Sequence, residues 1–278
     1  MTSRPIRRGG GHVRRTRPVR RASAGLTPVR AAAILGMLTS AGAIYGLTAS
    51  SAFGLSVIDV SGATFTGAAT VTERLALATG QNLFDIATEP LEADLREIPA
   101  VAAADVSIGL PDRVSVSIVE RKPIVVWQVG ERRLLVDGNG YLFAELGPTT
   151  TGPAVDSLPV VSDSRAAAST LAVGGTLDPV ILDAASRLAS LKPGDVGSSA
   201  AGLTVAVTDE HGFVVGSGPN GWEAWFGFYI LSVRSTDLIP GQVQLLKTLL
   251  AGREANVATV ILGDDRDGTY IPKPSAKP

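Results

Sequence analysis

The stretch GQNLFDIATEPLEADLREIPAVAAADVSIGLPDRVSVSIVERKPIVVWQ, residues 80–128, decides the fold of this 278-residue chain. A helix is predicted over about Glu89–Glu97, capped by Thr88, because leucine and isoleucine recur there at helical spacing behind an early proline. Two strands are predicted next, Ala104–Leu110 and Arg113–Glu120, because apolar and polar residues alternate in both and a Pro-Asp turn joins them. The stretch therefore predicts a helix followed by a β-hairpin.

One strand and one helix are predicted on the N-terminal side of this stretch. Ser56–Ser61 (SVIDVS) has a β-rich composition and closes on a glycine. A capping box of Thr70 and Glu73 predicts a helix that ends at Gly80. The element order over residues 54–122 is therefore β-α-α-β-β. In its last strand the predicted inward-facing residues are Val114, Val116 and Ile118, and the outward-facing ones are Ser115 and Ser117.

The C-terminal side, residues 123–271, is predicted to be rich in strands and to contain two helices. The helices are Pro179–Leu191 and Pro240–Leu250, each opened by a proline and apolar at helical spacing. Residues 147–176 are rich in Gly, Pro, Ser, Thr and Ala and predict a long loop or partly ordered insert. The fold class is therefore α+β. The strand-like runs are 124–129, 132–136, 141–145, 202–208, 212–216, 222–228 and 257–262.

The N-terminal region divides into a basic stretch and an uncharged stretch. Residues 1–30 hold nine arginines and no acid, so the remainder has 16 basic against 26 acidic side chains, a net charge of −10. No charged residue lies between Arg30 and Asp59. As a helix, residues 31–52 would extend about 33 Å, enough for a membrane core of about 30 Å. Because arginines stay on the cytoplasmic side, we predict a basic cytoplasmic tail, one transmembrane helix and an exported body.

Two other interpretations of this region stay open. Arginine-rich arms can bind nucleic acid, although an apolar segment directly after the arm favours a role in membrane topology. The small residues at 49–52 would suit a signal peptidase, which would make the apolar segment a cleaved export signal. The basic region is long for a signal peptide, so an uncleaved anchor is favoured.

The composition excludes several kinds of active site. The chain has no cysteine, and its two histidines, His12 and His211, lie far apart, which argues against thiolate sites and histidine metal sites. Gly216–Gly221 spells G-x-G-x-x-G, but its Pro-Asn-Gly turn predicts a hairpin rather than a nucleotide-binding loop. The acidic run Asp264–Gly268 lacks the first and last acids of a calcium loop. We therefore predict no catalytic, cofactor-binding or metal-binding residue, and no enzyme.

The ordered series of motifs resembles the POTRA domain of the bacterial division family FtsQ/DivIB. Ile58, Val60 and Gly62 occupy the places of the family's opening V-x-V-x-G-like strand, and Pro111 to Val125 match its closing hairpin with E-R-x-P-V. The Val-Asp-x-x-Gly-x-x-Phe turn of the family is also present. The segments that carry the resemblance are FGLSVIDVSGATF at 53–65, the stretch at 80–128 and LLVDGNGYLF at 134–143.

The resemblance implies an organisation and a function. A basic cytoplasmic tail at 1–30 and a transmembrane helix at 31–52 would be followed by a POTRA domain at 54–122 and an FtsQ-type β domain at 123–271, with 272–278 predicted as a disordered tail. The protein would be a non-enzymatic single-pass scaffold of the cytoplasmic membrane at the division septum. Its partners would be the division proteins FtsB/DivIC and FtsL, without nucleic acid, cofactor or small-molecule substrate. The alternative is a secreted or membrane-anchored cell-wall binding module or hydrolase.

The resemblance also implies a partner-binding site. In the FtsQ family the final strand of the β domain lies at a sheet edge, where a partner adds its own strand. The matching segment here is Val257–Tyr270, which begins with a run that is apolar on both faces, as in a strand covered on two sides. The exposed face of Trp222–Tyr229 is the second candidate. The predicted partner-binding residues are Val257, Thr259, Val260, Ile261, Leu262, Trp222, Phe226 and Tyr229.

Overall fold

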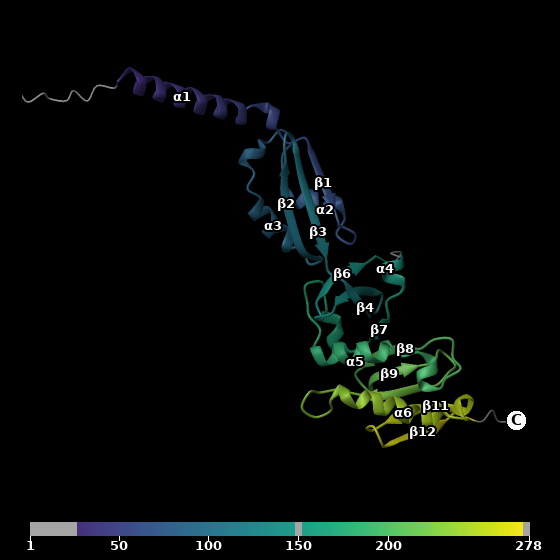
Figure 1. Ribbon diagram of the computed structural model, residues 1–278. Coiled ribbons are helices and arrows are strands. Elements are labelled where there is room, and N and C mark those ends of the chain that lie inside the picture. Colours follow the sequence, from purple (N-terminus) through teal and green to yellow (C-terminus); the bar gives the residue numbers. More distant parts are fainter. Residues whose placement is uncertain (1–26, 148–151, 275–278) are drawn as a thin grey trace, which may run out of the picture. The chain divides into compact units, whose positions relative to one another are not determined.

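The computed structural model describes residues 27–147 and 152–274 (Figure 1). Contacts divide the chain into two compact units, Met1–Ala52 and Phe53–Pro278. The predicted basic tail lies outside the described residues up to position 26, and so do positions 275–278 of the predicted disordered tail.

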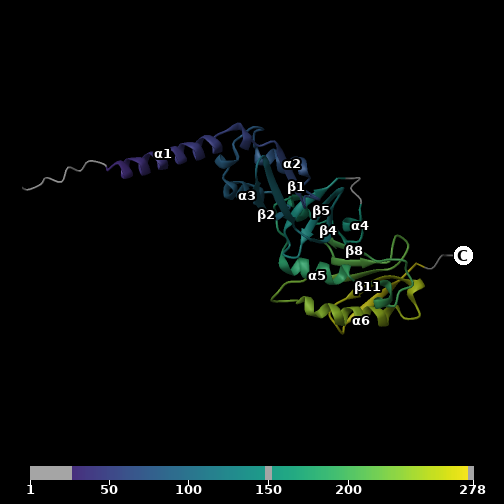
Figure 2. The same cartoon turned by 45° about the horizontal axis from the view of Figure 1, so that its top comes forward.

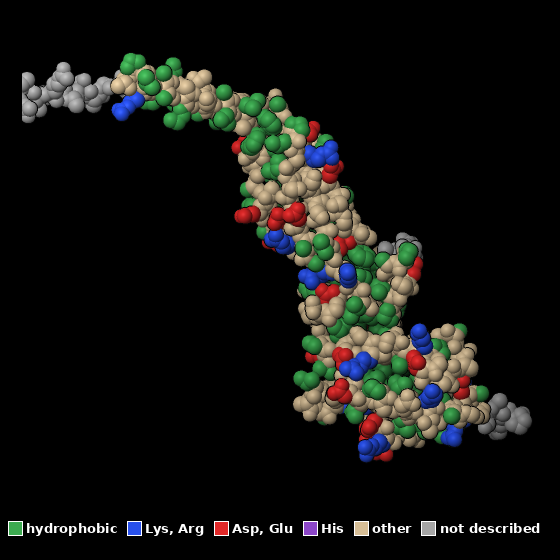
Figure 3. Space-filling view, viewed as in Figure 1, with side chains coloured by type: hydrophobic (Ala, Val, Ile, Leu, Met, Phe, Trp, Pro, Cys, Tyr) green, Lys and Arg blue, Asp and Glu red, His purple; other side chains and the backbone are tan. Residues whose placement is uncertain are grey.

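The helix of the first unit, α1, runs from Pro28 to Thr48 and has the length and composition of a membrane-spanning segment. Thr27 caps it by accepting a hydrogen bond from the backbone N–H of Arg30, and Pro28 occupies the first turn, where its missing N–H costs nothing. Hydrophobic and uncharged side chains cover the helix, with a basic side chain at its start (Figure 3). The predicted transmembrane segment was 31–52. The helix begins three residues earlier, because Thr27 supplies the cap, and its last residue, Thr48, lies four residues before the predicted end.

The second unit begins with a three-stranded sheet and two helices, which confirms the predicted order β-α-α-β-β. The sheet order is β1-β3-β2, with β1 parallel and β2 antiparallel to the central β3. The inward-facing residues of β3 are buried, as predicted, because the helices cover that face of the sheet. The elements are β1 (Val57–Ser61), α2 (Ala68–Leu75), α3 (Thr88–Arg96), β2 (Val101–Gly109) and β3 (Arg113–Glu120).

The predicted ends of α2 and the predicted cap of α3 are wrong. The helix α2 follows Gly67 with no side-chain cap, so Thr70 lies inside the helix instead of capping it. It ends at Leu75 because Ala76 takes the left-handed conformation, which terminates a helix as a glycine would. Thr88 is likewise the first residue of α3 and does not cap it.

The rest of the second unit is built on a nine-stranded sheet with the order β12-β11-β10-β9-β8-β7-β4-β5-β6. Two strands were not predicted: β7 lies within the predicted long loop, and β12 includes Pro272 of the predicted tail. The strands are β4 (Pro123–Val129), β5 (Arg132–Asp137), β6 (Leu142–Leu146), β7 (Val160–Asp163), β8 (Thr204–Thr208), β9 (Gly212–Gly216), β10 (Glu223–Gly227), β11 (Val257–Leu262) and β12 (Gly268–Pro272).

Two helices cover the C-terminal half of this sheet, α5 (Pro179–Ala189) and α6 (Ile239–Leu250); a short helix, α4 (Pro153–Asp156), precedes β7. Figure 2 shows α5 and α6 beside the strands, and their apolar residues share one core with them. The Asp178 side chain caps α5 by accepting the N–H of Val180. Helices packed on a mostly antiparallel sheet make this an α+β structure, which confirms the predicted fold class.

The adjacent residues Glu120 and Arg121 hold the end of β3 to its surroundings. The Glu120 carboxylate accepts the backbone N–H groups of residues 64–66 at 2.7–2.9 Å. The Arg121 guanidinium donates to the Asp137 carboxylate at 2.9 Å and lies 4.5 Å from the centre of the Tyr141 ring. A small core extends across this junction, with the buried residues Ala100, Val126, Leu135, Phe143, Leu146 and Val155.

Candidate partner-binding site

The last strand, β12, is one edge of the nine-stranded sheet, and all five of its residues are exposed. Its inner neighbour β11 pairs with β10 on one side and with β12 on the other. The segment predicted to lie at a sheet edge, Val257–Tyr270, therefore spans both strands: its first part, β11, is an inner strand, and the edge is β12, which begins at Gly268. The physical reason is that a tight turn at 263–267 returns the chain along β11 and covers its free side.

The register of β12 on β11 shows which backbone N–H and C=O groups of β12 face away from the sheet. The N–H of Gly263 donates to the carbonyl of Asp267 at 2.8 Å, so this opposed pair is a hydrogen-bonded one. Hydrogen-bonded and non-bonded pairs alternate in an antiparallel ladder, so Thr269 and Ile271 bond to β11. The backbone groups of Tyr270 therefore point away from the sheet, available to another chain.

Two of the three other sheet edges, those at β6 and β2, are partly covered. At β6, the opposite end of the large sheet, the N–H of Leu142 donates to Gly175 and its carbonyl accepts from Gly174. At β2 in the small sheet, the N–H of Val106 donates to the Glu92 carboxylate at 3.2 Å. Within residues 27–147 and 152–274, no such bond reaches the outward groups of Tyr270. The edge at β12 is thus open to strand addition.

The structure places the predicted partner-binding residues of β11 in the interior of the sheet. Val257, Val260 and Leu262 are buried in the large core, on the face of β11 that α6 covers. Thr259 and Ile261 are half-buried on the other face of the sheet. Partner binding by these five residues stays a prediction, but an added strand cannot pair with β11 while β12 occupies its side.

The predicted residues of the second candidate segment are also buried. Trp222 and Phe226 belong to the large core, and Tyr229 donates its hydroxyl proton to Gln242 at 2.7 Å. Burial raises the pKa of Tyr229 above its ordinary value, and nearby Arg234 opposes this in part. The accessible aromatic residue of β10 is Trp225, on which His211 stacks at 3.6 Å.

A polar cluster anchors the start of β11 to the neighbouring loops. The Glu254 carboxylate accepts hydrogen bonds from the Ser198 hydroxyl, from the Ser199 N–H at 3.0 Å and hydroxyl at 2.9 Å, and from the Trp222 indole at 3.0 Å. Burial alone would raise the pKa of Glu254, but these donors together lower it to about 2. The cluster therefore holds a carboxylate, not a carboxylic acid, at neutral pH.

Gly216–Gly221 is a hairpin turn, as predicted, and the acidic run Asp264–Gly268 leads from β11 into β12. Gly216–Gly221 connects the antiparallel strands β9 and β10. In the turn before β12, the Asp264 carboxylate accepts the N–H groups of Asp267 and Arg266, both at 2.7 Å, and these bonds lower its pKa. Over the described part of the chain, no three His, Asp or Glu side chains gather into a possible metal site.

Comparison with known proteins identifies the family. Residues 53–121 match the model of the POTRA domain, FtsQ-type. The cell division protein FtsQ of Streptomyces coelicolor is 30% identical over 182 residues, which cover 61% of this chain and 67% of that relative. The chain belongs to the FtsQ family. The FtsQ of Chloroflexus aurantiacus is 26% identical over 229 residues, or 82% of this chain and 74% of that protein, so the FtsQ similarity extends well beyond the POTRA domain.

Membership of the FtsQ family gives the chain a role in cell division. Within residues 27–147 and 152–274, one helix, α1, is long and apolar enough to cross a membrane, which is compatible with a single-pass membrane protein. The sequence missed β12 as the edge, although one signal for it was present. The acidic turn at 264–268 lies between two β-prone runs, VATVIL and TYIP, which is the pattern of a hairpin.

Proposed function

We propose that this protein is a non-enzymatic scaffold that is anchored in the cytoplasmic membrane and holds other exported division proteins at the septum. The open edge of β12 carries the proposal, because a free row of backbone groups binds an extended segment of another chain through main-chain hydrogen bonds. Membership of the FtsQ family supports it. The partners would be FtsB/DivIC and FtsL.

In the proposed topology α1 spans the membrane, with the arginine-rich N-terminus in the cytoplasm and residues from Phe53 onward outside. The charge pattern supports this orientation, since residues 1–30 carry nine arginines and no acid while the remainder is acidic. Mass spectrometry of the intact chain, extracted from membranes, tests whether α1 is retained as an anchor. An intact N-terminus is expected, whereas a chain that starts near Ala52 would show α1 to be a cleaved signal.

Strand addition is tested by two substitutions at one position. Tyr270→Pro removes the outward N–H of β12, and the proline ring stands where the partner strand would lie. Tyr270→Ala removes the same side chain but keeps the donor. The full-length variants are co-expressed with full-length FtsB/DivIC and FtsL, and the captured amounts are compared.

We expect Tyr270→Pro to weaken capture by about tenfold relative to Tyr270→Ala, since one main-chain hydrogen bond and the close approach of the strand are lost. Both variants should keep the far-ultraviolet circular dichroism of the wild type, because the inward bonds of Thr269 and Ile271 remain. Equal capture by two folded variants would contradict strand addition at β12.

A further inference from the structure

The loop Phe228–Arg234, which follows β10, carries an exposed apolar group that the fold does not cover. Leu231 is 81% exposed and Val233 is 80% exposed, and Phe228 and Ile230 are about half exposed. Single exposed apolar residues are ordinary on protein surfaces, but four within six consecutive positions form a patch, which marks an interaction surface.

Hydrogen bonds hold this loop in one conformation. The N–H of Ile230 donates to the carbonyl of Arg234 at 3.0 Å, and the N–H of Arg234 donates back at 2.8 Å. The Arg234 guanidinium donates to the carbonyls of Phe226 at 2.7 Å and Leu262 at 3.0 Å, which ties the loop to the ends of β10 and β11. The exposed side chains are therefore pre-ordered for binding, which lowers the entropy cost of a contact.

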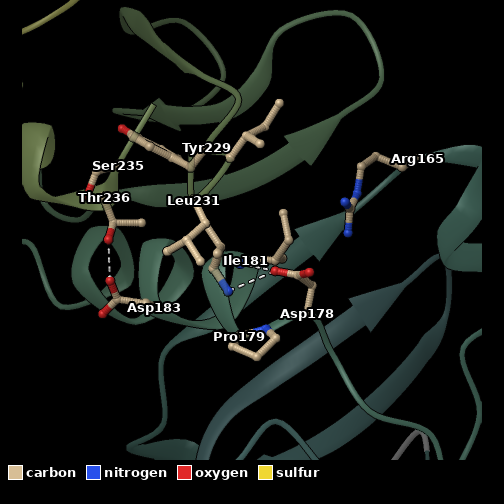
Figure 4. Close-up of a pocket in the computed structure, with 11 residues that line it drawn as sticks. Arg165, Asp178, Pro179, Ile181, Asp183, Tyr229, Leu231, Ser235 and Thr236 are labelled. Atoms are coloured by element: carbon tan, nitrogen blue, oxygen red, sulfur yellow. Dashed lines mark hydrogen bonds between the residues drawn. The ribbon is translucent and has the colours of Figure 1, made fainter. Parts of the chain in front are cut away.

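A cavity of about 730 Å³ opens beside the loop, at the start of α5. Figure 4 shows Leu231 and Ile181 close together at this cavity, with Arg165 at its far side. Pro179, Val180, Ile181, Tyr229, Ile230 and Leu231 provide its apolar lining. Its volume is within the range of pockets that hold a few side chains or a small ligand.

The charges around the cavity leave an acidic rim. Arg165 is neutralised, since it donates to the buried Asp163 carboxylate at 2.7 and 2.9 Å. Asp183 is bonded by Arg187 and by the Thr236 hydroxyl. Asp178, at the cavity, has no ion-pair partner among the described residues, and Asp237, next to Thr236, is 83% exposed with its nearest cation, Arg187, 3.8 Å away.

We propose that this surface, the loop 228–234 with the cavity beside it, binds an apolar segment of a partner protein that is flanked by lysine or arginine. The acidic rim selects this occupant. Anionic lipid headgroups would be repelled by Asp178 and Asp237, and a second copy of this chain would bring the same two carboxylates against each other. The proposal rests on the proposed scaffold function and gives it a second contact that does not use β12.

The test uses the full chain in nanodiscs of zwitterionic lipid, with an environment-sensitive fluorophore on Ser232→Cys. The natural chain has no cysteine, so the label goes to one site, between Leu231 and Val233. The probes are three synthetic peptides of equal length: two leucines flanked by lysines, two leucines flanked by glutamates, and two serines flanked by lysines. Vesicles of anionic lipid are the fourth probe.

We expect the lysine–leucine peptide to shift the emission to shorter wavelength and the other probes to do so at least about tenfold more weakly. Leu231→Ser with Val233→Ser should weaken its binding about tenfold. The control pair Leu110→Ser and Val119→Ser, at exposed positions in the turn before β3 and in β3 itself, should not. The double variant Asp178→Asn, Asp237→Asn should bind the lysine–leucine peptide several-fold more weakly, and this binding should depend less on salt. The asparagine at 178 can still cap α5, so the helix is preserved.

Equal binding of the glutamate–leucine peptide, an unchanged affinity of the Leu231→Ser, Val233→Ser variant, or a stronger response to vesicles would overturn the proposal. Tyr270→Pro should leave peptide binding unchanged. If Tyr270→Pro loses partner capture but the natural chain does not bind the lysine–leucine peptide, this inference fails and the proposed function stands. If Tyr270→Pro keeps partner capture, the β12 edge that carries the proposed function fails, whatever the peptide does.

Discussion

The carboxylate of Glu254 is expected to contribute more to stability than any other single acid at the surface of the large sheet. Glu254→Ala removes the acceptor for the Trp222 indole N–H and for the donors of Ser198 and Ser199. The Trp222 side chain is buried. The serines can turn to water, but the indole N–H is left without its partner.

The size of the effect follows from these contacts. A hydrogen bond to a charged group contributes about 1.5–3 kcal/mol, and an unpaired buried donor costs about 1–3 kcal/mol. Glu254 is partly wetted, so we take a loss of about 2–3 kcal/mol for the whole cluster. For a folded unit of this size, that lowers the Tm by about 5–10 °C. Glu254→Gln keeps one carbonyl acceptor and should lower it by about half as much.

Thermal unfolding of the full chain in detergent, followed by circular dichroism at pH 7 and at pH 3, is the assay. The pKa of Glu254 in the folded protein, about 2, lies below its ordinary value of 4.5. The stabilisation is therefore complete above pH 4.5 and is lost as the pH falls toward 2. The difference in Tm between wild type and Glu254→Ala should accordingly be smaller at pH 3.

Glu210→Ala is the matched control, because that carboxylate is highly exposed and its nearest ionisable partner is His211 at 3.7 Å. Its Tm should stay within about 1–2 °C of the wild type. Equal Tm values for the two alanine variants, or a Glu254 difference that grows toward pH 3, would refute the reasoning. A Trp222→Phe background should remove much of the effect, since the indole donor is then gone.

Three further outcomes are expected. Val114→Asp should unfold the small sheet, because it places an unpaired charge in the core, while Ser117→Asp on the open face leaves the Tm almost unchanged; equal losses would reverse the assigned facing. Arg121→Gln should lower the Tm by about 4–8 °C, since the buried Asp137 loses its cation; an unchanged Tm would show that the pair is solvated. Replacing residues 1–30 by a scrambled sequence of equal charge should preserve membrane orientation and division in a complementation assay, and loss of division would indicate a specific cytoplasmic contact.

The elements predicted correctly from the sequence are those in which buried and exposed positions alternate with the period of the helix or strand. The strict alternation in Arg113–Glu120 predicted both ends of β3, because one face of that strand is buried and the other is open. All five residues of β12 are exposed, so no alternation of apolar and polar residues marks this strand. The four-residue β7 is too short to show a period within its small-residue surroundings. The start of α2 was missed because Gly67, rather than Thr70, precedes the helix.

The segment predicted to lie at a sheet edge, Val257–Tyr270, contains the inner strand β11 and the start of the edge strand β12, and partner binding there stays a prediction. An apolar pattern on both faces of Val257–Leu262 is expected whether helices, a partner or neighbouring strands cover it, so the pattern alone could not identify what lies beside β11. The loop at 228–234 gave no periodic signal at all. Its importance depends on the distant donors and acceptors that fix it, Arg234 with Leu262 and Tyr229 with Gln242, which only the folded chain brings together.

The dipeptide Glu120–Arg121 bears on how this protein can be shortened. A chain that begins at Lys122 would keep every strand of the large sheet, yet it would lose the cation that neutralises Asp137. It would also bare one side of Val126, Leu135 and Phe143, which share a core with Ala100 and Phe65. The end of the matched POTRA model, residue 121, is therefore a poor place to separate the small sheet from the large one. A fragment made for binding studies should retain the small sheet, or replace these apolar residues with polar ones, to remain soluble.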